Sequence, residues 1–477
     1  MDFSVDVKHV PLCVDLDGTL VATDTLWEGL ATLLLKRPYL LFHVAFWVFK
    51  GKAYLKQKVA SYTDSSAQDW PLRKEVLDYI EAAKQSGRKA YLVTGAAKAT
   101  ALELSNHLGI FDGVFHSSEQ ENLTSHLKAA KLVTEFGEAG FDYIGNSRDD
   151  VVVFDIARKG IVVSPDSAAR RWQELNDGEE INVPLPSPNT IFKSIRVHQW
   201  AKNMLIGVPL VLDHNLFEMQ AVVAAIIAFF SFSFFASSVY IVNDLSDLKA
   251  DRAHAKKRYR PLASGALSIP VAAMTWFALV AASISLASLL PVQFILILTL
   301  YAVVTTAYTF VLKRKLLVDV FTLAGLYTIR IIAGAVATFS ELSFWLLAFS
   351  IFFFLSLALV KRYVEVSELG DDDNSNVVGR GYSGVDANML IQGGISSAFA
   401  ATMVLALYIN SNEVIGMYSN PWMIWPLVPI ILYMQLRIWI LAGRGQVHED
   451  PVVFIMRDWR SQLTMVMGGA LLLIAMV

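Results

Sequence analysis

Two aspartates that stand two residues apart follow an apolar segment near the N-terminus. Asp15 and Asp17 belong to the string Val-Asp-Leu-Asp-Gly-Thr, in which Gly18 permits a sharp turn. At the end of a strand both carboxylates can point into one site, where one attacks phosphorus and the other handles a proton. A phosphoryl-aspartate intermediate divides hydrolysis into two easier steps, and Mg²⁺ neutralises the phosphate oxygens. The pattern indicates phosphate chemistry, and a solvated surface turn is its plain alternative.

Further groups suited to phosphate chemistry stand at or near later apolar segments. Thr94 offers a hydroxyl donor, Lys128 supplies a cation, and the string Gly-Asn-Ser-Arg-Asp-Asp at 145–150 ends in carboxylates. We expect Thr94 and Lys128 to bind the phosphate. The expected metal ligands of this site are Asp15, Asp17 and Asp150.

A second acidic string lies far along the chain, directly after a long apolar segment. Asn243, Asp247 and Asp251 follow one another at intervals of four residues, so at ~100° per residue they share one face of a helix. Acids just outside an apolar span are costly to hold together unless a cation bridges them. Together with the flanking Asp244, they are predicted to bind Mg²⁺ that carries a diphosphate.

Basic residues follow the acidic string and add anion-binding power. Arg252 and Lys257 precede Arg260, which opens the string Arg-Pro-Leu-Ala-Ser-Gly, and all three are expected to share the charge of the diphosphate. For the basic loop alone, an ordinary solvated loop with a capping acid is the simpler interpretation. The acids and the basic loop together favour a binding site.

The first 190 residues alternate short apolar segments with polar helical patterns, which is typical of a parallel sheet covered on both faces. The expected strands are residues 10–16, 89–94, 113–115, 141–145 and 160–164. Residues 182–191 are rich in proline and polar side chains, as linkers are. The expected organisation is a soluble α/β domain over residues 1–181, a linker over 182–191 and a second domain over 192–477.

Beyond Lys202 the chain is dominated by uncharged apolar segments. A helix needs ~20 apolar residues to cross a bilayer, and we expect nine crossings. They are residues 204–212, 219–242, two within 268–312, 316–338, 342–360, 387–412, 414–436 and 463–477. Alternate loops carry Lys and Arg and the others carry none, so by the positive-inside rule the basic loops and the N-terminal domain face the cytosol. We expect a multi-pass protein of the bacterial inner membrane with cytosolic active sites.

Residues 27–49 are apolar and aromatic but are interrupted by Lys36, Arg37 and Pro38. The stretch that remains, residues 38–49, is too short to span a bilayer. It is expected to form either an interfacial helix or lid that rests on the membrane, or a buried helix of a small cap domain. The sequence leaves both alternatives open.

Composition narrows the classes of protein further. The chain has 477 residues, of which 55% are hydrophobic and 17% charged, and its formal net charge is −3. We therefore expect at least two domains and a bilayer environment. The net charge itself says nothing about nucleic acid, and no nucleic-acid partner is expected. Cys13 is the only cysteine, so an internal disulfide is excluded, and a buried structural role is expected. Residues 1–10 lack the basic start and apolar core of a signal peptide.

Residues 11–164 resemble the haloacid-dehalogenase phosphatase superfamily, because the Asp-Leu-Asp-Gly-Thr string, Thr94, Lys128 and the final acidic string occur in that order. The resemblance implies a Rossmann-like parallel sheet with a small helical cap, catalytic Asp15 and Asp17, and Mg²⁺ as cofactor. The last motif of that superfamily usually begins Gly-Asp, whereas this chain has Asn146. The neutral amide should weaken Mg²⁺ binding. A docking or regulatory domain is the alternative to an active phosphatase.

Residues 192–477 look like the UbiA prenyltransferase superfamily, on the acidic string at 243–251 and the Arg-Pro-Leu-Ala-Ser-Gly string after it. The resemblance implies an all-α fold of nine transmembrane helices around a central cavity. It also implies a catalytic Mg²⁺-diphosphate site made by Asn243, Asp247 and Asp251. Members with aromatic acceptors carry a second acidic motif after the sixth span, but the three aspartates at 371–373 are typical of a solvated loop.

Further strings are similar to decaprenyl-phosphate 5-phosphoribosyltransferases. They are residues 196–203, 308–320, 330–335, 361–365, 449–451 and 457–458. This resemblance implies transfer of 5-phosphoribose from phosphoribosyl diphosphate to a polyprenyl phosphate. Lys202, Lys313 and Arg330 are expected to bind the donor's 5-phosphate or the lipid phosphate, and a structural bridge between Arg330 and Asp319 is the alternative. The full set of expected substrate-binding residues is Thr94, Lys128, Lys202, Asn203, Arg252, Lys257, Arg260, Lys313, Asp319 and Arg330.

The two parts suggest consecutive reactions. A phosphoribosyl lipid carries a 5-phosphate, which a tethered cytosolic phosphatase would remove. The chain is also a candidate for assembly into a homo-oligomer. One alternative is a prenyltransferase that moves a prenyl group from its diphosphate to an aromatic or other acceptor, beside a regulatory N-terminal domain. A transporter or lipid-binding scaffold is another, although transporters usually place charges at the midplane and these charges gather at one rim.

Overall fold

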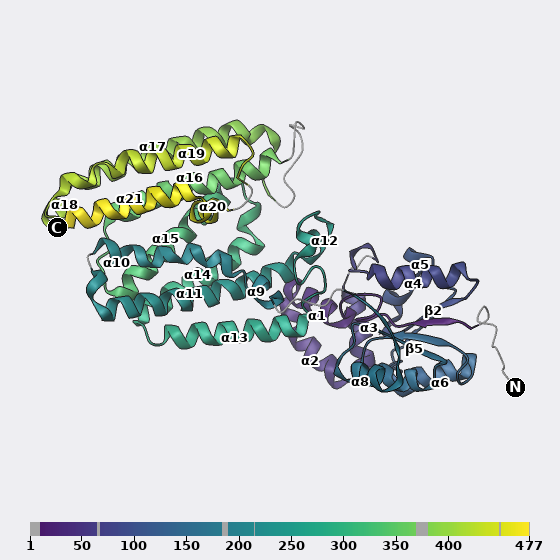
Figure 1. Ribbon diagram of the computed structural model, residues 1–477. Coiled ribbons are helices and arrows are strands. Elements are labelled where there is room, and N and C mark those ends of the chain that lie inside the picture. Colours follow the sequence, from purple (N-terminus) through teal and green to yellow (C-terminus); the bar gives the residue numbers. More distant parts are fainter. Residues whose placement is uncertain are drawn as a thin grey trace. The chain divides into compact units, whose positions relative to one another are not determined.

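The computed structural model describes residues 10–63, 67–183, 189–213, 215–368, 380–447 and 450–476. The three aspartates at 371–373 lie outside these ranges, as do residues 184–188 of the expected linker. The chain forms two compact units (Figure 1). Unit 1 contains Met1–Ile195 and Tyr240–Trp276, and unit 2 contains Arg196–Val239 and Phe277–Val477.

Unit 1 is built on a six-stranded parallel sheet with the strand order β3-β2-β1-β4-β5-β6. The strands are β1 (Leu12–Val14), β2 (Ala90–Ala97), β3 (Gly113–Ser117), β4 (Asp142–Gly145), β5 (Lys159–Val163) and β6 (Glu179–Ile181). The parallel sheet and its first five strands are confirmed. The edge strand β6 was not predicted, because it is three residues long and half-buried and its sequence is Glu-Glu-Ile.

Helices cover both faces of the sheet because neighbouring strand residues point to opposite sides. They are α4 (Lys74–Gln85), α5 (Lys98–Leu108), α6 (Ser125–Phe136), α7 (Arg148–Ile156) and α8 (Ser167–Asn176). Leu12 and Val14 pack in one cluster with residues of α4 and α5, whereas Cys13 packs in the other with residues of α6, α7 and α8. Figure 1 shows these two helical layers. The expected burial of Cys13 is confirmed.

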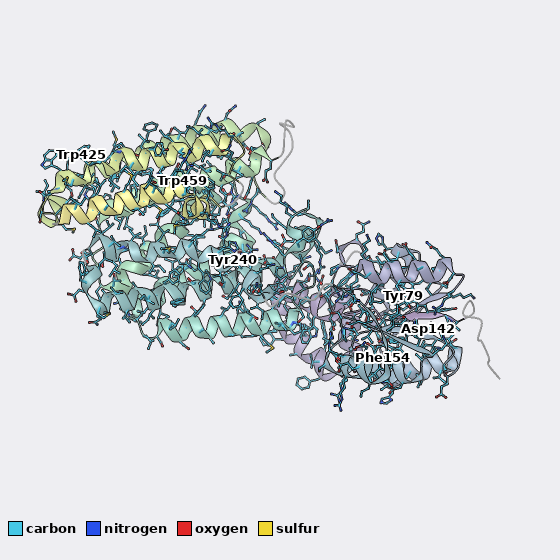
Figure 2. The ribbon with its side chains drawn as sticks, viewed as in Figure 1. Tyr79, Asp142, Phe154, Tyr240, Trp425 and Trp459 are labelled. Atoms are coloured by element: carbon cyan, nitrogen blue, oxygen red, sulfur yellow. The ribbon has the colours of Figure 1, made fainter. Side chains whose placement is uncertain are left out.

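Ion pairs occupy the end of the sheet at which β1 and β4 begin. Asp142, labelled in Figure 2, opens β4 and accepts from Arg88 at 2.5 Å and from Arg158 at 2.6 Å. Phe154 on α7 stacks on Trp172 of α8 with ring centroids 4.6 Å apart. A reaction site in unit 1 is therefore expected at the opposite end of the sheet, where the parallel strands end.

A helical cap is inserted between β1 and β2. It consists of α1 (Thr25–Lys36), η2 (Pro38–Leu40), α2 (Leu41–Phe49) and α3 (Lys52–Tyr62), and the short turn η3 (Ala67–Asp69) follows it. Asp24 caps α1 by accepting from the amides of Leu26 and Trp27. The cap has its own apolar cluster, made by Leu26, Leu33, Leu40, Val44, Trp47, Leu55 and Val59. Part of the 38–49 stretch is thus buried in a cap, and its remaining side chains are exposed.

Unit 2 is all helical among the residues that the structure describes. Besides the larger part of α11 (Met219–Ser246) and of α13 (Ile269–Ala287), it contains η4 (Val197–Gly207), α10 (Val208–Leu212), η5 (Asn215–Phe217), α14 (Val292–Phe310), η7 (Leu312–Arg314), α15 (Val318–Thr338), α16 (Phe344–Ser367), η8 (Gly384–Asp386), α17 (Ala387–Ile409), α18 (Asn412–Met417), η9 (Pro421–Ile424), α19 (Leu427–Gly443), α20 (Pro451–Arg457) and α21 (Trp459–Met476). One apolar cluster joins residues of α15, α16, α17, α19 and α20, and another joins residues of α11, α14 and α15.

Seven of the described helical segments are long and apolar enough to cross a membrane. They are Met219–Ser246, Ile269–Ala287, Val292–Phe310, Val318–Thr338, Phe344–Ser367, Gly384–Ile409 and Pro421–Gly443. The chain is therefore a multi-pass membrane protein. The expected count of nine is not confirmed, because residues 204–212 are divided between η4 and the five-residue helix α10, and α21 is not among the seven.

Candidate functional site

The first candidate site lies where β1 ends, and Lys128 is at its centre. The Lys128 ammonium donates to Asp15 Oδ1 at 2.8 Å and to Asp150 Oδ1 at 3.1 Å. All three side chains are buried. Burial lowers the pKa of Lys128, but the carboxylates of Asp15 and Asp150 outweigh burial and raise it above its ordinary value. Asp15 and Lys128, more than a hundred residues apart in sequence, thus lie in one site as the sequence predicted.

Asp150 has a structural role in this site. Its carboxylate accepts from the Tyr143 hydroxyl at 2.6 Å, from the amides of Asn146 and Ser147 at 3.1 Å, and from the Ser147 hydroxyl at 2.9 Å. Together with Ser147 it forms the capping box of α7. These bonds and the one from Lys128 occupy both carboxylate oxygens, so the arrangement favours orientation of Lys128 over the metal-ligand role that the sequence suggested.

Asn146 and Asp15 are joined by a single hydroxyl. Thr19 Oγ1 lies 3.3 Å from Asp15 Oδ2 and 3.3 Å from Asn146 Oδ1. Gly18 has a φ of 76°, and a Cβ built on it would lie 2.3 Å from the Asn146 amide nitrogen, so glycine is required for this close approach. The carboxylate of Asp15 and the amide oxygen of Asn146 are both oxygen donors of the kind Mg²⁺ accepts. The residues present fit a magnesium ion at this position.

Asp17 is poised for proton transfer. Its Oδ1 accepts from the amide of Thr25 at 2.8 Å, at the start of α1. Burial, with the neighbouring carboxylates of Asp24 and Asp15, raises the pKa of Asp17 to about 7, and burial raises the pKa of Asp15 to about 6. A carboxyl group with a pKa near neutrality suits a general acid. Thr94, also predicted for this site, is fully buried in β2 and accepts from the amide of Ala96 at 2.9 Å.

One residue near this site was missed by the sequence analysis. Lys56 of α3 is buried, and its ammonium donates to the carbonyl of Gly95 at 2.5 Å and to Asn122 Oδ1 at 3.2 Å. Burial lowers the pKa of Lys56, while the carboxylate of Asp17 opposes this. Its only sequence signal is the run of basic residues without acids in the cap.

The second acidic string is broken where the sequence predicted one continuous helix. Helix α11 ends at Ser246 and α12 (Leu248–Ala253) begins after Asp247. The backbone bonds from Asp247 N to Asn243 O at 2.9 Å and from Asp251 N to Asp247 O at 2.8 Å nevertheless keep the spacing of a helical turn. The three predicted residues are therefore still stepped along one side of the chain.

Arg260 pairs with two carboxylates of this string. Its guanidinium donates to Asp251 at 2.7 Å and to Asp244 at 3.3 Å, and both acids are buried. Two carboxylates that converge on one positive group form a donor set that also fits a divalent cation. Among the described residues, no group of three or more acids, histidines or cysteines lies close enough to hold a metal ion in this conformation.

Arg252 lies elsewhere than the sequence suggested. Its guanidinium makes a bidentate pair with Glu28 of α1 at 2.6 and 2.8 Å, and it also donates to the backbone carbonyls of Asp69 and Ala263. These bonds use its donors on protein groups, so its predicted diphosphate contact is not supported. Lys257 lies exposed in η6 (Lys257–Tyr259).

The third candidate site is a cluster of cations in unit 2, which we call the Asp450 cluster. Lys202 and Lys361 donate to Asp450 Oδ2 at 2.7 and 3.2 Å, and the Tyr327 hydroxyl donates to Asp450 Oδ1 at 3.0 Å. The Tyr327 ring lies 5.8 Å from the Lys202 ammonium and 5.7 Å from the Arg330 guanidinium. Lys202 and Arg330 are thus brought together as predicted, and Asp450 and Lys361 are additions.

Neutral partners hold Arg330 in place. Its guanidinium donates to Asn203 Oδ1 at 2.8 Å and to the Tyr301 hydroxyl at 3.2 Å. The predicted alternative, a bridge to Asp319, is replaced by another pair: Asp319 is fully buried, lies 2.5 Å from Arg362 and accepts from the Tyr382 hydroxyl at 2.5 Å. Asp319 therefore pairs with Arg362 and Tyr382 and not with Arg330, and its substrate-binding role stays a prediction.

The elements that carry the Asp450 cluster pack closely. η4 is tied to α11 by bonds from Trp200 to Ser237 and from Asn203 to Ser233, both 2.9 Å. A Cβ on Gly334 of α15 would lie 2.0 Å from the carbonyl oxygen of Ile206, so glycine is required where α15 passes η4. Lys313, predicted for the same cluster, lies in η7.

The pKa values of two residues in the Asp450 cluster are shifted. Burial lowers the pKa of Lys202 to about 8, against the opposing effect of Asp450. Burial would raise the pKa of Asp450, but Lys202 and Lys361 outweigh it and hold that pKa well below its usual range. The carboxylate thus stays ionised and the cluster keeps an excess of positive charge.

The chain is similar to known proteins over much of its length. The sequence model described as the UbiA prenyltransferase family matches residues 204–457, more than half of the chain. Protein y4nM of Sinorhizobium fredii is 36% identical over 96% of this chain and 89% of its own length. The nodulation protein NoeC of Azorhizobium caulinodans is 30% identical over 59% of this chain and 91% of its own length.

A third relative is named for its reaction. The decaprenyl-phosphate phosphoribosyltransferase of Corynebacterium glutamicum is 34% identical over 196 residues, which are 40% of this chain and 59% of that protein. Among solved structures, a UbiA homolog from Archaeoglobus fulgidus bound to GPP and Mg²⁺ is 15% identical, with a TM-score of 0.47 over 60% of this chain and 99% of that chain.

Proposed function

This chain belongs to the UbiA prenyltransferase family, and on that premise we propose that it transfers 5-phosphoribose from phosphoribosyl diphosphate to a polyprenyl phosphate. The Asp450 cluster carries the proposal. Lys202 and Lys361 donate to one carboxylate, and Arg330 adds a third cation beside Tyr327 of the same cluster. Buried charges are costly unless they are matched, so the excess positive charge calls for an anionic guest.

A phosphate monoester suits this cluster. Its oxygens accept several charge-assisted hydrogen bonds at once, and the neutral partners of Arg330, Asn203 and Tyr301, leave its charge available. An arginine inside a membrane protein marks a functional site by default. The guest would be the 5-phosphate of the donor or the phosphate of the lipid. The similarity to the phosphoribosyltransferase of C. glutamicum supports this substrate class.

The acidic string would serve the leaving group. Asn243, Asp244, Asp247 and Asp251 would hold Mg²⁺, which neutralises the charge that grows on the departing diphosphate. Arg260 would then release its two carboxylates and donate to the diphosphate instead. The lipid phosphate oxygen forms a bond to the anomeric carbon of ribose while the bond to the diphosphate oxygen breaks. Positioning and electrostatic stabilisation of the leaving group supply most of the catalysis.

The N-terminal domain would act on the product as a haloacid-dehalogenase-type phosphatase. Asp15 attacks the phosphorus of the 5-phosphate, Asp17 protonates the departing ribose oxygen, and water then hydrolyses the aspartyl phosphate to inorganic phosphate. Lys128 holds Asp15, and Asn146 with Asp15 would hold Mg²⁺. The proposed boundaries are residues 1–181 for this domain, 182–191 for the linker and 192–477 for the transferase, with both active sites on the cytosolic side of a bacterial inner membrane.

A comparison of two donors, each supplied separately, tests the transfer. Purified protein in liposomes is given polyprenyl phosphate with either phosphoribosyl diphosphate or a prenyl diphosphate and an aromatic acid. The proposal expects a lipid that carries ribose from the first mixture, and the state of its 5-phosphate reports the phosphatase. A prenylated aromatic acid from the second mixture, with no product from the first, would instead establish the ordinary prenyltransferase, which the family description itself favours as the second candidate.

The phosphatase has a test of its own. Asp15→Asn should make the product of the first mixture heavier by one phosphate than the wild-type product, because the nucleophile is lost while transfer continues. Mass spectrometry of the extracted lipid reads this difference directly. Identical products from both proteins would reject the phosphatase and leave a docking or regulatory domain.

A further inference from the structure

We propose that the cap helix α2 lies in the membrane interface, with its outward face in contact with lipid. The helix is nine residues long. Phe42 is 82% exposed, Phe46 57% and Phe49 90%. Large apolar side chains on a soluble surface normally stand singly, whereas here they are gathered on one short helix.

Both faces of α2 are apolar. Val44 and Trp47 are buried in the cap cluster, so the cap core already uses the inward face. The outward face carries further apolar side chains, and His43 is the only polar residue of the helix. A surface helix ordinarily presents charged or polar residues on the side that faces water. The outward face of α2 therefore needs an apolar partner outside the cap.

The charge around the helix identifies that partner. Residues 29–63 contain six Lys or Arg and no Asp or Glu. Lys36 and Arg37 precede the helix and Lys50 and Lys52 follow it, and all four are exposed. The Lys50 ammonium lies 5.0 Å from the centre of the Phe46 ring. Apolar aromatic residues framed by basic ones are typical of helices that lie in an anionic lipid surface.

A second copy of this chain fits the same face less well. Two copies would bring equal clusters of positive charge together, and like charges repel. An anionic bilayer offers opposite charge and apolar depth at once. It is also always present, because the same chain contains seven helices long and apolar enough to span a membrane. The observations favour lipid.

Docking would place the phosphatase site at the membrane surface. α3 follows α2 after Gly51, whose φ is 102°, and α3 carries Lys56 to the carbonyl of Gly95 at the end of the phosphatase sheet. The substrate class would then be a phosphate ester attached to a lipid and not a free sugar phosphate. This second step rests on the proposed function, whereas the docking of α2 does not.

Fluorescence quenching tests the docking in the full-length protein. Phe42→Cys, Phe46→Cys and, as a matched control, Leu175→Cys are labelled with bimane in liposomes that contain phosphatidylglycerol. Leu175 is 74% exposed on α8, and the native Cys13 is buried and does not react. We expect a spin-labelled lipid to quench positions 42 and 46 several-fold more than position 175, and aqueous iodide to show the reverse order.

Two results would overturn the docking. One is equal quenching by the spin-labelled lipid at positions 46 and 175. The other is a disulfide between two unlabelled F46C copies, together with weak quenching of the labelled positions 42 and 46 by both the spin-labelled lipid and iodide, which would mean that a second copy covers the face.

Hydrolysis tests the substrate class. The double variant Phe42→Asp/Phe46→Asp should lose most of its activity on a phosphoribosyl lipid in liposomes and keep its activity on soluble p-nitrophenyl phosphate. Equal activity of variant and wild type on the lipid would show that the docking of α2 does not bring a lipid-linked substrate to the site. If the wild-type protein hydrolyses neither compound, the phosphatase fails, while the quenching experiment still decides the docking.

Discussion

At the scale of single residues, the Asp450 cluster combines more positive than negative charge in a buried place. Lys202 and Lys361 donate to the Asp450 carboxylate, and Tyr327 contacts Asp450, Lys202 and Arg330. Arrangements of this kind bind anions, and their affinity depends on the protonation of the weakest cation. Lys202 is that cation, because burial lowers its pKa to about 8.

We predict that the Michaelis constant for the substrate that binds here rises as the pH increases through 8. Lys202 is charged below its pKa and neutral above it, so its contribution to binding is present at lower pH and lost at higher pH. Lys202→Arg stays charged throughout, and its rise should be displaced to higher pH. Initial rates over a pH series check this. The same pH profile in both proteins would remove Lys202 from the phosphate site.

Asn146 gives a prediction at the same scale for the proposed phosphatase. Its Oδ1 accepts from Thr19 Oγ1 at 3.3 Å, and an aspartate there could accept the same bond. Because Mg²⁺ prefers carboxylates, Asn146→Asp should lower the Mg²⁺ concentration for half-maximal hydrolysis several-fold. Asn176→Asp, at an exposed position of α8, is the control that should leave this concentration unchanged. A Mg²⁺ titration that does not respond to Asn146→Asp argues against a metal beside Asn146.

At the scale of elements, close packing between α15 and η4 positions the Asp450 cluster. Gly334 faces the backbone of Ile206, and Asn203 on η4 holds Arg330 of α15. The separation of the two elements therefore fixes how far Lys202 lies from Arg330. Gly325, on the same helix, has open space where a Cβ would stand.

Gly334→Ala should damage transfer and Gly325→Ala should not. The added methyl group at 334 would meet a backbone oxygen at 2.0 Å, and overpacking of this kind costs about 1–3 kcal/mol. We expect a lower melting temperature and a lower transfer rate for Gly334→Ala, with hydrolysis of p-nitrophenyl phosphate unchanged. Equal transfer rates in the two alanine variants would show that the η4–α15 contact does not position the site.

The pair between Glu28 and Arg252 joins α1 of the cap to α12, which carries Asp251. Only about a tenth of either side chain is exposed, and removing one partner of such a pair costs about 3–5 kcal/mol when it is fully buried. Glu28→Ala should therefore lower the transfer rate although Glu28 belongs to the N-terminal domain. The more exposed pair of Lys249 and Asp69 is the matched control, and Asp69→Asn should have little effect.

Exchange of the two charges distinguishes the pair from its separate residues. The double variant Glu28→Arg/Arg252→Glu should recover part of the transfer rate that Glu28→Arg alone loses. Failure of the double variant to exceed both single variants would mean that α12 does not depend on this contact.

At the scale of the whole molecule, the sequence predicted local regularities and missed partners from distant elements. The alternation of short apolar segments predicted the parallel sheet, because a buried strand is recognisable from its own apolar residues. The strand at Glu179–Ile181 is short and polar and gave no such signal. Asp450 and the Glu28 partner of Arg252 could not be predicted, because the contacts at 2.6–2.7 Å join residues about 220–250 positions apart.

The proposed transfer of a phosphoribosyl group to a lipid depends on the acidic string around Asp247. The direct measurement uses full-length protein in liposomes with polyprenyl phosphate and phosphoribosyl diphosphate labelled in the ribose, and counts label in the extracted lipid. Label should enter the lipid with wild-type protein and with the exposed-surface control Asp78→Asn, and fall by about 10²-fold or more with Asp247→Asn. Lipid that stays unlabelled with the wild-type protein, or that is labelled equally by Asp247→Asn, would contradict the account.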